Sequence, residues 1–211
     1  YPAGVPILVS MATWTDVTAQ NPDHSENYAR RWQTMIDRGD DIDGEARLVD
    51  ALVPRNARIL DAGCGQGRVG GYLAARGHEV TGTDIDPVLI SHARELYPDA
   101  AWAVGDLSAD EIPGGGFDLA VSTGNVMGFL AVDGRLPALE NITRALKPGG
   151  RFVVGFGAGR GWGFDDFMAT AREAGLEPEN VFESWDLKPF TENSQFLVAI
   201  FTRPSTPAHR R

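Results

Sequence analysis

The stretch ILDAGCGQGRVGG, residues 59–71, contains two overlapping glycine patterns that directly follow a short apolar run. The first pattern, G-x-G-x-x-G, is formed by Gly65, Gly67 and Gly70. The second pattern, G-x-G-x-G, is formed by Gly63, Gly65 and Gly67. In either register the stretch predicts a strand, a turn whose backbone N–H groups approach a ligand, and a helix. The first register is typical of dinucleotide binding, so the choice of register bears on the ligand.

Downstream of this stretch, strand-like and helix-like segments alternate. The strand-like segments are residues 57–62, 78–84, 100–106, 117–123, 150–156, 180–187 and 194–203. The helix-like segments between them are residues 67–77, 87–96, 134–146 and 164–175. Asp86 followed by Pro87 predicts an N-cap and a proline at the first helical position. This winding predicts an α/β fold with a doubly wound, mostly parallel seven-stranded sheet and helices on both faces.

The last two strand-like segments depart from simple winding. They are joined only by KPFTEN, residues 188–193. A crossover between parallel strands takes roughly a dozen residues or more, so this connection is too short for one. We therefore expect the two segments to pair antiparallel, which makes the last strand antiparallel to the rest of the sheet.

Composition narrows the class of function. The chain has 211 residues, a formal net charge of -10 and a single cysteine, Cys64. The negative charge argues against nucleic acid as a partner, because that binding draws on cations that neutralise phosphates. No apolar run approaches the roughly 20 residues of a membrane span, and no basic leader is evident, so we expect a cytoplasmic protein without a membrane partner. One cysteine excludes an internal disulfide and a cysteine-built zinc cluster, and no metal site is expected.

Three parts are predicted along the chain. Residues 1–54 form an N-terminal extension with helices at 25–38 and 43–53, and Met11 is a candidate native start. Residues 55–203 form the core domain, and residues 204–211 form a flexible tail that ends in HRR.

From about Ala57 to Thr202 the chain resembles the class I S-adenosylmethionine-dependent methyltransferases. Five motifs carry the resemblance, in family order: ILDAGCGQG, VTGTDID, AVGDLSADEIP, FDLAVSTGNV and ALKPGGRFVV. The resemblance implies a Rossmann-like fold, S-adenosylmethionine as the cofactor and transfer of a methyl group to a small-molecule acceptor. It gives no oligomeric state. The tetrapeptide STGN stands where nucleic-acid and protein amide methyltransferases carry an NPPY-type motif, which argues against those acceptors.

The charge at Asp61 favours the second glycine register. A carboxylate at the end of the first strand repels the pyrophosphate of a dinucleotide. S-adenosylmethionine brings instead a sulfonium and an ammonium group, for which a nearby carboxylate is favourable. Gly70 then becomes a close-packing position on the helix. An NAD-dependent oxidoreductase and a non-catalytic S-adenosylmethionine-binding module remain alternatives, and titration with S-adenosylhomocysteine and NAD separates the first of them.

The resemblance also implies the cofactor contacts. They are Asp61, Ala62, Gly63, Cys64, Gly65, Gly67, Asp84, Ile85, Gly105, Asp106, Leu107, Ser122 and Thr123. Asp84 accepts hydrogen bonds from the ribose, Asp106 binds the adenine amino group, and Leu107 and Ile85 sandwich the ring. The carbonyls of Ser122 and Thr123 lie near the methionine amine. Capping of a turn by Asp106 and plain strand termination at Ser122 and Thr123 remain open, and Asp86 is assigned to capping.

Two segments are candidates for the acceptor pocket. Tyr28, Arg31 and Trp32 resemble the lid that small-molecule members of the family carry, although an aromatic stripe that only packs on the core is an equal alternative. The glycine-rich loop 155–163 is predicted to be flexible and to present Arg160 and Trp162. No catalytic residue is assigned. His24 is the only histidine that precedes a segment able to fold over the site, and Cys64 has no base beside it.

Overall fold

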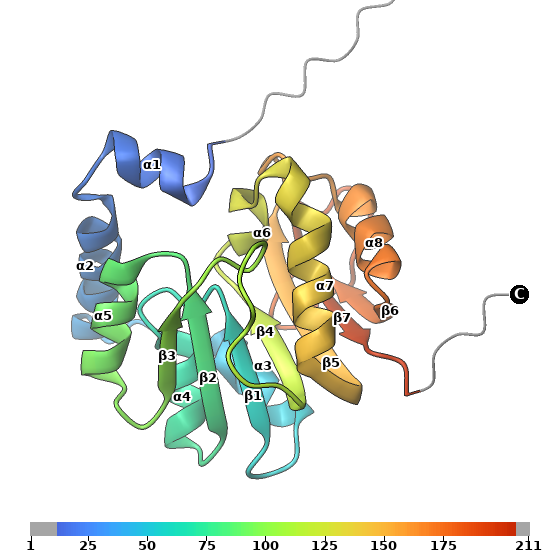
Figure 1. Ribbon diagram of the computed structural model, residues 1–211, viewed down its shortest axis with the longest axis horizontal. Helices are drawn as coiled ribbons and strands as arrows, with labels where there is room; N and C mark the ends of the chain where they lie inside the picture. The colour runs from blue at the N-terminus through green and yellow to red at the C-terminus, as the bar shows by residue number, and fades with distance from the viewer. Residues whose placement is uncertain (1–11, 206–211) are drawn as a thin grey trace, which may run out of the picture.

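A seven-stranded β-sheet forms the centre of the molecule, with the strand order β3-β2-β1-β4-β5-β7-β6 (Figure 1). The computed structural model describes residues 12–205, so Met11 and the tail residues 206–211 lie outside the described part. The strands are β1 (Arg58–Ala62), β2 (Glu79–Asp84), β3 (Ala101–Val104), β4 (Phe117–Ser122), β5 (Leu146–Gly157), β6 (Glu177–Phe182) and β7 (Phe196–Thr202).

The pairing of the strands confirms the predicted winding. β1 pairs in parallel with β2 and β4, β2 with β3, and β4 with β5. β7 lies between β5 and β6 and pairs antiparallel with both of them. The doubly wound, Rossmann-like sheet with an antiparallel last strand is thus confirmed.

Helices cover both faces of this sheet. They are α1 (Trp14–Gln20), α2 (His24–Asp37), α3 (Gly44–Leu52), α4 (Arg68–Ala75), α5 (Pro87–Leu96), α6 (Val126–Phe129), α7 (Arg135–Ala145) and α8 (Phe164–Glu173), with a 3-10 turn at Val132–Gly134. Successive strand side chains point to opposite faces. In β1, Ile59 packs into the cluster that contains α3 and α4, while Leu60 packs into the cluster that contains α7 and α8. Alternation therefore builds two cores, one on each face.

The strand order reverses next to β1, and this reversal places the site. The chain winds from β1 through β2 to β3 on one side, and then returns to β4 on the other side of β1. In open α/β sheets, ligands bind at the carboxyl ends of the strands where such a reversal occurs. Figure 1 shows α1 above this end of the sheet, extending from α2 toward α6.

The N-terminal helix α1 was not anticipated from the sequence. It begins after Thr13, whose hydroxyl accepts a hydrogen bond from the Asp16 N–H at 3.2 Å. The Asp16 carboxylate in turn accepts from the Thr13 N–H at 2.9 Å, which completes a capping box. The two predicted helices that follow are confirmed as α2 and α3, each with slightly different ends. Among residues 12–205, the structure has no helix of the length and apolarity that crossing a membrane requires.

Candidate functional site

A cavity of about 710 Å³ opens at the carboxyl ends of β1, β2 and β4. Its size falls within the range of roughly 300 to 1,000 Å³ of small-molecule sites. Thirteen of the predicted site residues line it: Tyr28, Arg31, Trp32, Gly63, Cys64, Gly65, Asp84, Ile85, Gly105, Asp106, Leu107, Thr123 and Arg160. The fold thus brings the glycine-rich turn, three strand ends and the N-terminal helices around one space.

The glycine-rich turn separates the two registers. Gly63 and Gly65 both line the cavity and have positive φ angles, 77° and 54°, which favour glycine. A Cβ atom at Gly65 would meet only the Tyr28 ring, at 3.7 Å. A Cβ atom at Gly70 would lie 2.7 Å from Trp102, inside the core. Gly70 is therefore the close-packing position that was predicted. Gly63, which only the second register contains, faces the cavity together with Gly65, which both registers share.

Three residues of this stretch do not line the cavity, in contrast to the expectation. Gly67 is the N-cap of α4 and faces Trp102. Ala62 is buried in β1, and Asp61 has only 1% of its surface exposed. β1 has strands on both sides and helices on both faces, so its side chains are directed into the cores rather than into the cavity.

Asp61 links β1 to the first turn of α4 through a buried hydrogen bond. Its carboxylate accepts a hydrogen bond from the Gly70 N–H at 2.8 Å. Burial raises the pKa of Asp61 to about 7, although the Gly70 hydrogen bond and Arg68 both favour the charged form. Asp61 therefore supports the turn from inside the protein and does not line the cavity.

Asp84 lies at the carboxyl end of β2 and holds the turn from the side. One carboxylate oxygen accepts from the Gly65 N–H at 2.8 Å, and the other accepts from the Asp86 N–H at 2.9 Å. Burial raises the pKa of Asp84 to about 6, although these two hydrogen bonds favour the charged form and lower the pKa. The side chain lines the cavity, so its remaining lone pairs can accept hydrogen bonds from a ligand.

The far end of the cavity is apolar, with a carboxylate beside it. Ile85 is 40% exposed although it is apolar, and Leu107 lies buried at the same cavity wall. Asp106 accepts from the Ser108 N–H at 2.7 Å, so the turn-capping interpretation is confirmed for one of its oxygens. Asp106 also lines the cavity, and capping does not exclude a contact with a ligand.

The loop after β4 forms the opposite wall. Gly124 and Asn125 have φ angles of 67° and 66°, which turn the chain sharply, and the Asn125 side chain accepts from the Gly157 N–H at 2.8 Å. Thr123 lines the cavity, whereas Ser122 does not. The Ser122 hydroxyl is buried, and it has no hydrogen-bond partner in the described part of the chain. Val126, at the start of α6, packs directly on Gly63.

α2 contributes the aromatic residues that were predicted from its spacing. Tyr28 and Trp32 are half-buried, and burial raises the pKa of Tyr28. The Arg68 guanidinium lies 4.3 Å from the centre of the Trp32 ring and pairs with Glu45 at 2.8 Å. Only two residues of α2, Ser25 and Ala29, are buried. The aromatic side chains of α2 thus line the cavity and do not belong to the buried cores.

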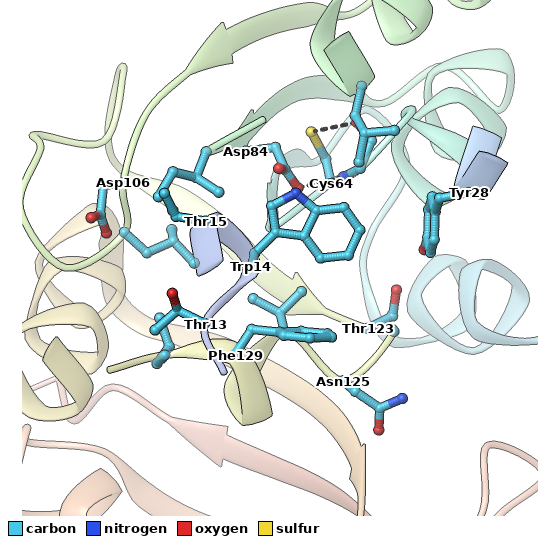
Figure 2. A pocket seen from close by; sticks show the side chains of 18 of the residues that line it. Thr13, Trp14, Thr15, Tyr28, Cys64, Asp84, Asp106, Thr123, Asn125 and Phe129 are labelled. Carbon is cyan, nitrogen blue, oxygen red and sulfur yellow. Dashed lines mark hydrogen bonds between the residues drawn. The ribbon is translucent and has the colours of Figure 1, made fainter. Parts of the chain in front are cut away.

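Sequence reasoning missed two aromatic residues of this wall, Trp14 and Phe129. Their ring centres lie 5.4 Å apart, and Trp14 also contacts Tyr28 at 5.6 Å and His24 at 5.0 Å. Figure 2 shows the Trp14 indole in the middle of the view, between Asp84 and Phe129. The capping box of Thr13 and Asp16 is the sequence signal that could have revealed α1 and therefore Trp14. The four-residue helix α6, which carries Phe129, has no comparable signal.

The loop after β5 differs from the prediction. Trp162 is 3% exposed and packs on Phe167 in the core, with ring centres 5.1 Å apart. The Arg135 guanidinium lies 4.8 Å from the Trp162 ring and donates to the Gly161 carbonyl at 2.7 Å. Trp162 therefore anchors the loop instead of presenting a side chain to the cavity. Only Arg160 of the two predicted residues lines it.

Few side chains at the cavity can carry acid–base or nucleophilic chemistry. Cys64 is buried, and burial raises its pKa well above the ordinary thiol value, which leaves it protonated and inert. His24 lines the cavity. His78 is bonded to Asp50 at the opposite end of β2, and His92 is bonded to Glu26. His24 is thus the one histidine at the cavity in the described part of the chain.

Comparison with known proteins gives consistent results. A family model described as a methyltransferase domain matches residues 59–150. The crystal structure of a TehB-like SAM-dependent methyltransferase from Corynebacterium glutamicum is 64% identical, with a TM-score of 0.85 over 87% of this chain and 100% of that chain. An uncharacterized methyltransferase from Mycobacterium tuberculosis is 33% identical over 110 residues, which are 51% of this chain and 54% of that protein.

A third relative has a named acceptor. The malonyl-[acyl-carrier protein] O-methyltransferase of Erwinia pyrifoliae is 38% identical over 111 residues, which are 51% of this chain and 40% of that protein. The chain spans about half the length, or less, of the curated relatives it matches.

Proposed function

Because this chain belongs to the class I S-adenosylmethionine-dependent methyltransferases, we propose that it transfers the methyl group of that cofactor to a small molecule held in the cavity beneath α1 and α2. The observation that carries the proposal is that α1 and α2 cover the cavity, and we call these two helices its roof. Trp14, Tyr28 and Trp32, all from the N-terminal helices, line the same space as the glycine-rich turn. A site covered by its own chain fits a small acceptor better than a macromolecular surface.

The residues at the turn fit S-adenosylmethionine. Gly65 faces only the Tyr28 ring across the cavity, and the Asp84 carboxylate borders the same space. Gln66 also lines the cavity, and its buried side-chain oxygen has no hydrogen-bond partner within residues 12–205. Such an oxygen is costly to leave unpaired, and a ligand ammonium group would satisfy it. These hydrogen-bond acceptors therefore suit a ligand with hydroxyl groups and positive charge.

In this proposal the two sides of the cavity have different tasks. Asp84 binds the ribose hydroxyls, and Ile85 and Leu107 enclose the adenine ring, whose amino group Asp106 binds. The carbonyl of Thr123 lies beside the methionine amine. The bound cofactor supplies an electrophilic methyl group on a good leaving group.

The chain's own contribution to the reaction is mainly alignment. Orientation of an acceptor against the donor accounts for a large part of the barrier lowering in such displacements. Trp14, Tyr28 and Phe129 enclose the acceptor and exclude water from it. Where an acceptor must lose a proton, His24 is the base within the cavity.

An acceptor screen tests the proposal. The purified protein is incubated with radiolabelled S-adenosylmethionine and a panel of small oxygen, nitrogen, sulfur and carboxylate nucleophiles. A parallel arm carries a malonyl group on acyl carrier protein, since one relative is named for that acceptor. The proposal expects label on a free small molecule. Label transferred only to the carrier-bound substrate would contradict it.

A further inference from the structure

The Asp86 carboxylate, which is not among the expected cofactor contacts, joins α1 and α2 to the core. Asp86 is buried, and its first oxygen accepts from the Val88 N–H at 2.8 Å, which caps α5. Its second oxygen accepts from the Trp14 indole N–H at 2.7 Å and from the Ser25 hydroxyl. The capping role predicted for Asp86 is confirmed, but it uses only half of the carboxylate.

The same residue is bonded to the cofactor side of the cavity. The Asp86 N–H donates to one oxygen of Asp84 at 2.9 Å, and the other Asp84 oxygen holds the Gly65 N–H. A continuous chain of hydrogen bonds therefore runs from the glycine-rich turn through Asp84 and Asp86 to Trp14. Buried charged acceptors make the stronger hydrogen bonds of proteins.

Few residues of α1 and α2 are buried, although the Arg68 cation on Trp32 and the hydrogen bond between His92 and Glu26 also hold α2. α1 has no buried residue, and Ser25 is one of the two buried residues of α2. Asp86 thus receives hydrogen bonds from both helices at a point where they have few other buried contacts. The Trp14 ring, held by this bond, projects into the cavity against Phe129 (Figure 2).

We propose that Asp86 is a positioning residue that seats Trp14 and Ser25, and thereby couples occupancy of the cofactor site at Asp84 to closure of α1 and α2 over the cavity. The inference rests on the proposed function, since it takes the space next to Asp84 as the cofactor site. A ligand that fixes Asp84 fixes the Asp86 backbone, which orients the carboxylate that holds the roof. A seated Trp14 in turn slows escape of the ligand.

Two substitutions separate this role from the capping of α5. Asp86→Asn keeps a good N-cap residue but replaces the second oxygen by an amide group, which cannot accept from Trp14. Trp14→Phe keeps an aromatic ring, removes the indole donor and makes the ring smaller. Trp185→Phe is the matched control, because Trp185 packs against the core that contains α3 and α4 and does not line the cavity.

The measurement is the rate of dissociation of S-adenosylhomocysteine by stopped-flow displacement, with the association rate measured in parallel. We expect Asp86→Asn and Trp14→Phe each to raise the dissociation rate about 5- to 30-fold, in line with loss of a hydrogen bond to a charged group. Association should change less than about twofold, as is common when a contact only retains the ligand. The double variant should resemble Asp86→Asn, because both single variants remove the same hydrogen bond between Trp14 and Asp86.

The outcomes distinguish this inference from the proposed function. Unchanged dissociation in both single variants, in a protein that binds S-adenosylhomocysteine, overturns the role of Asp86. Additive effects in the double variant overturn the coupling between the two residues. Failure of the unaltered protein to bind S-adenosylhomocysteine overturns the cofactor site itself. Should Asp86→Asn not fold, Trp14→Phe decides the question alone, since α1 contributes no buried residue.

Discussion

The floor and the roof of the cavity are built in different ways. The floor is the turn after β1 and the ends of β2 and β4, and it continues into the central sheet with its two buried cores. The roof is α1 and α2, which together bury only Ser25 and Ala29. Sites with few buried contacts open most easily, so the floor is expected to stay in place while the roof moves. This contrast suits a fixed cofactor and an exchangeable acceptor.

The two parts also differ in what holds them. Beneath the floor, backbone N–H groups bond to carboxylates, as at Asp61 and Asp84. In the roof, apart from the two hydrogen bonds to Asp86, aromatic edges contact one another and Phe129 at ring-centre distances of 5.0 to 6.4 Å. Backbone hydrogen bonds fix position closely, whereas edge contacts between rings tolerate shifts. Substitutions in the floor should accordingly cost more than substitutions in the roof.

The largest expected effect is that of Gly65→Val. The residue has a φ angle of 54° and faces the cavity, so a branched side chain strains the turn and occupies the ligand space. We expect the affinity for S-adenosylhomocysteine, measured by calorimetry, to fall by more than about 100-fold, or about 3 kcal/mol. Gly70→Ala is the control. It should lower the free energy of unfolding by about 1 to 3 kcal/mol through crowding of Trp102 and leave the affinity of the folded protein intact. Retained affinity in the Gly65 variant would mean that the turn does not face the ligand, and lost affinity in a folded Gly70 variant would contradict the packing role of Gly70.

Asp84→Ala should have the next largest effect. The substitution removes hydrogen bonds to a charged group at the wall of the cavity and weakens binding of S-adenosylhomocysteine by about 1.5 to 3 kcal/mol. Circular dichroism should show a folded protein. A folded variant with the dissociation constant of the unaltered protein would remove Asp84 from the site.

The buried Asp61 provides a test of the floor by pH. Its pKa in the folded protein is about 7, above the ordinary value of 3.8, so folding favours the protonated form. The stabilising contribution of the protonated group is complete below about pH 4 and is lost as the pH rises through 7. Denaturant unfolding at several pH values should show that Asp61→Asn reduces this loss by about 1 to 3 kcal/mol. Parallel pH profiles of the two proteins would show that the pKa of Asp61 is not raised.

The smallest effects are expected in the roof. Amide exchange over residues 28–35 should slow when S-adenosylhomocysteine is added, by about 3- to 10-fold, while exchange over residues 196–201 of β7 stays unchanged. Trp32→Ala should clearly lower the rate of methyl transfer while it changes the melting temperature only slightly. Two results would contradict this prediction: equal amide exchange over residues 28–35 with and without ligand, and a Trp32→Ala variant that has a lower melting temperature but normal methyl transfer. They would show that α2 is a static part of the core.

The floor was largely predictable from the sequence, whereas in the roof only α2 was predicted. Glycine spacing, the strand-end Asp84 and the cap at Asp86 are local signals, because each depends on residues adjacent in the chain. The contacts of Trp14 with Phe129 and Asp86 join residues separated by 115 and 72 positions, which no local pattern encodes. The capping box at Thr13 marks where α1 begins, yet it does not indicate where the helix packs.

Two side chains were assigned to the cavity although they point into the cores. Asp61 follows the family pattern, but a residue of a central strand takes its direction from the pleat, and here the pleat turns the carboxylate toward Gly70. Trp162 lies in a glycine-rich loop that looked flexible. The space beside Phe167 and the cation of Arg135 hold its ring in the core. In both cases tertiary packing decided the direction of a side chain within a correctly predicted segment.

A crystal structure of the complex with S-adenosylhomocysteine tests most directly whether the floor of the cavity binds the cofactor and the roof covers the acceptor. We expect the adenine between Ile85 and Leu107, the ribose on Asp84 and the homocysteine beside Gly65. The Trp14 ring should lie across the remaining space with its N–H on Asp86. A ligand seated where the indole of Trp14 now lies, with α1 and α2 displaced from Asp86, would contradict the division into a floor for the cofactor and a roof for the acceptor.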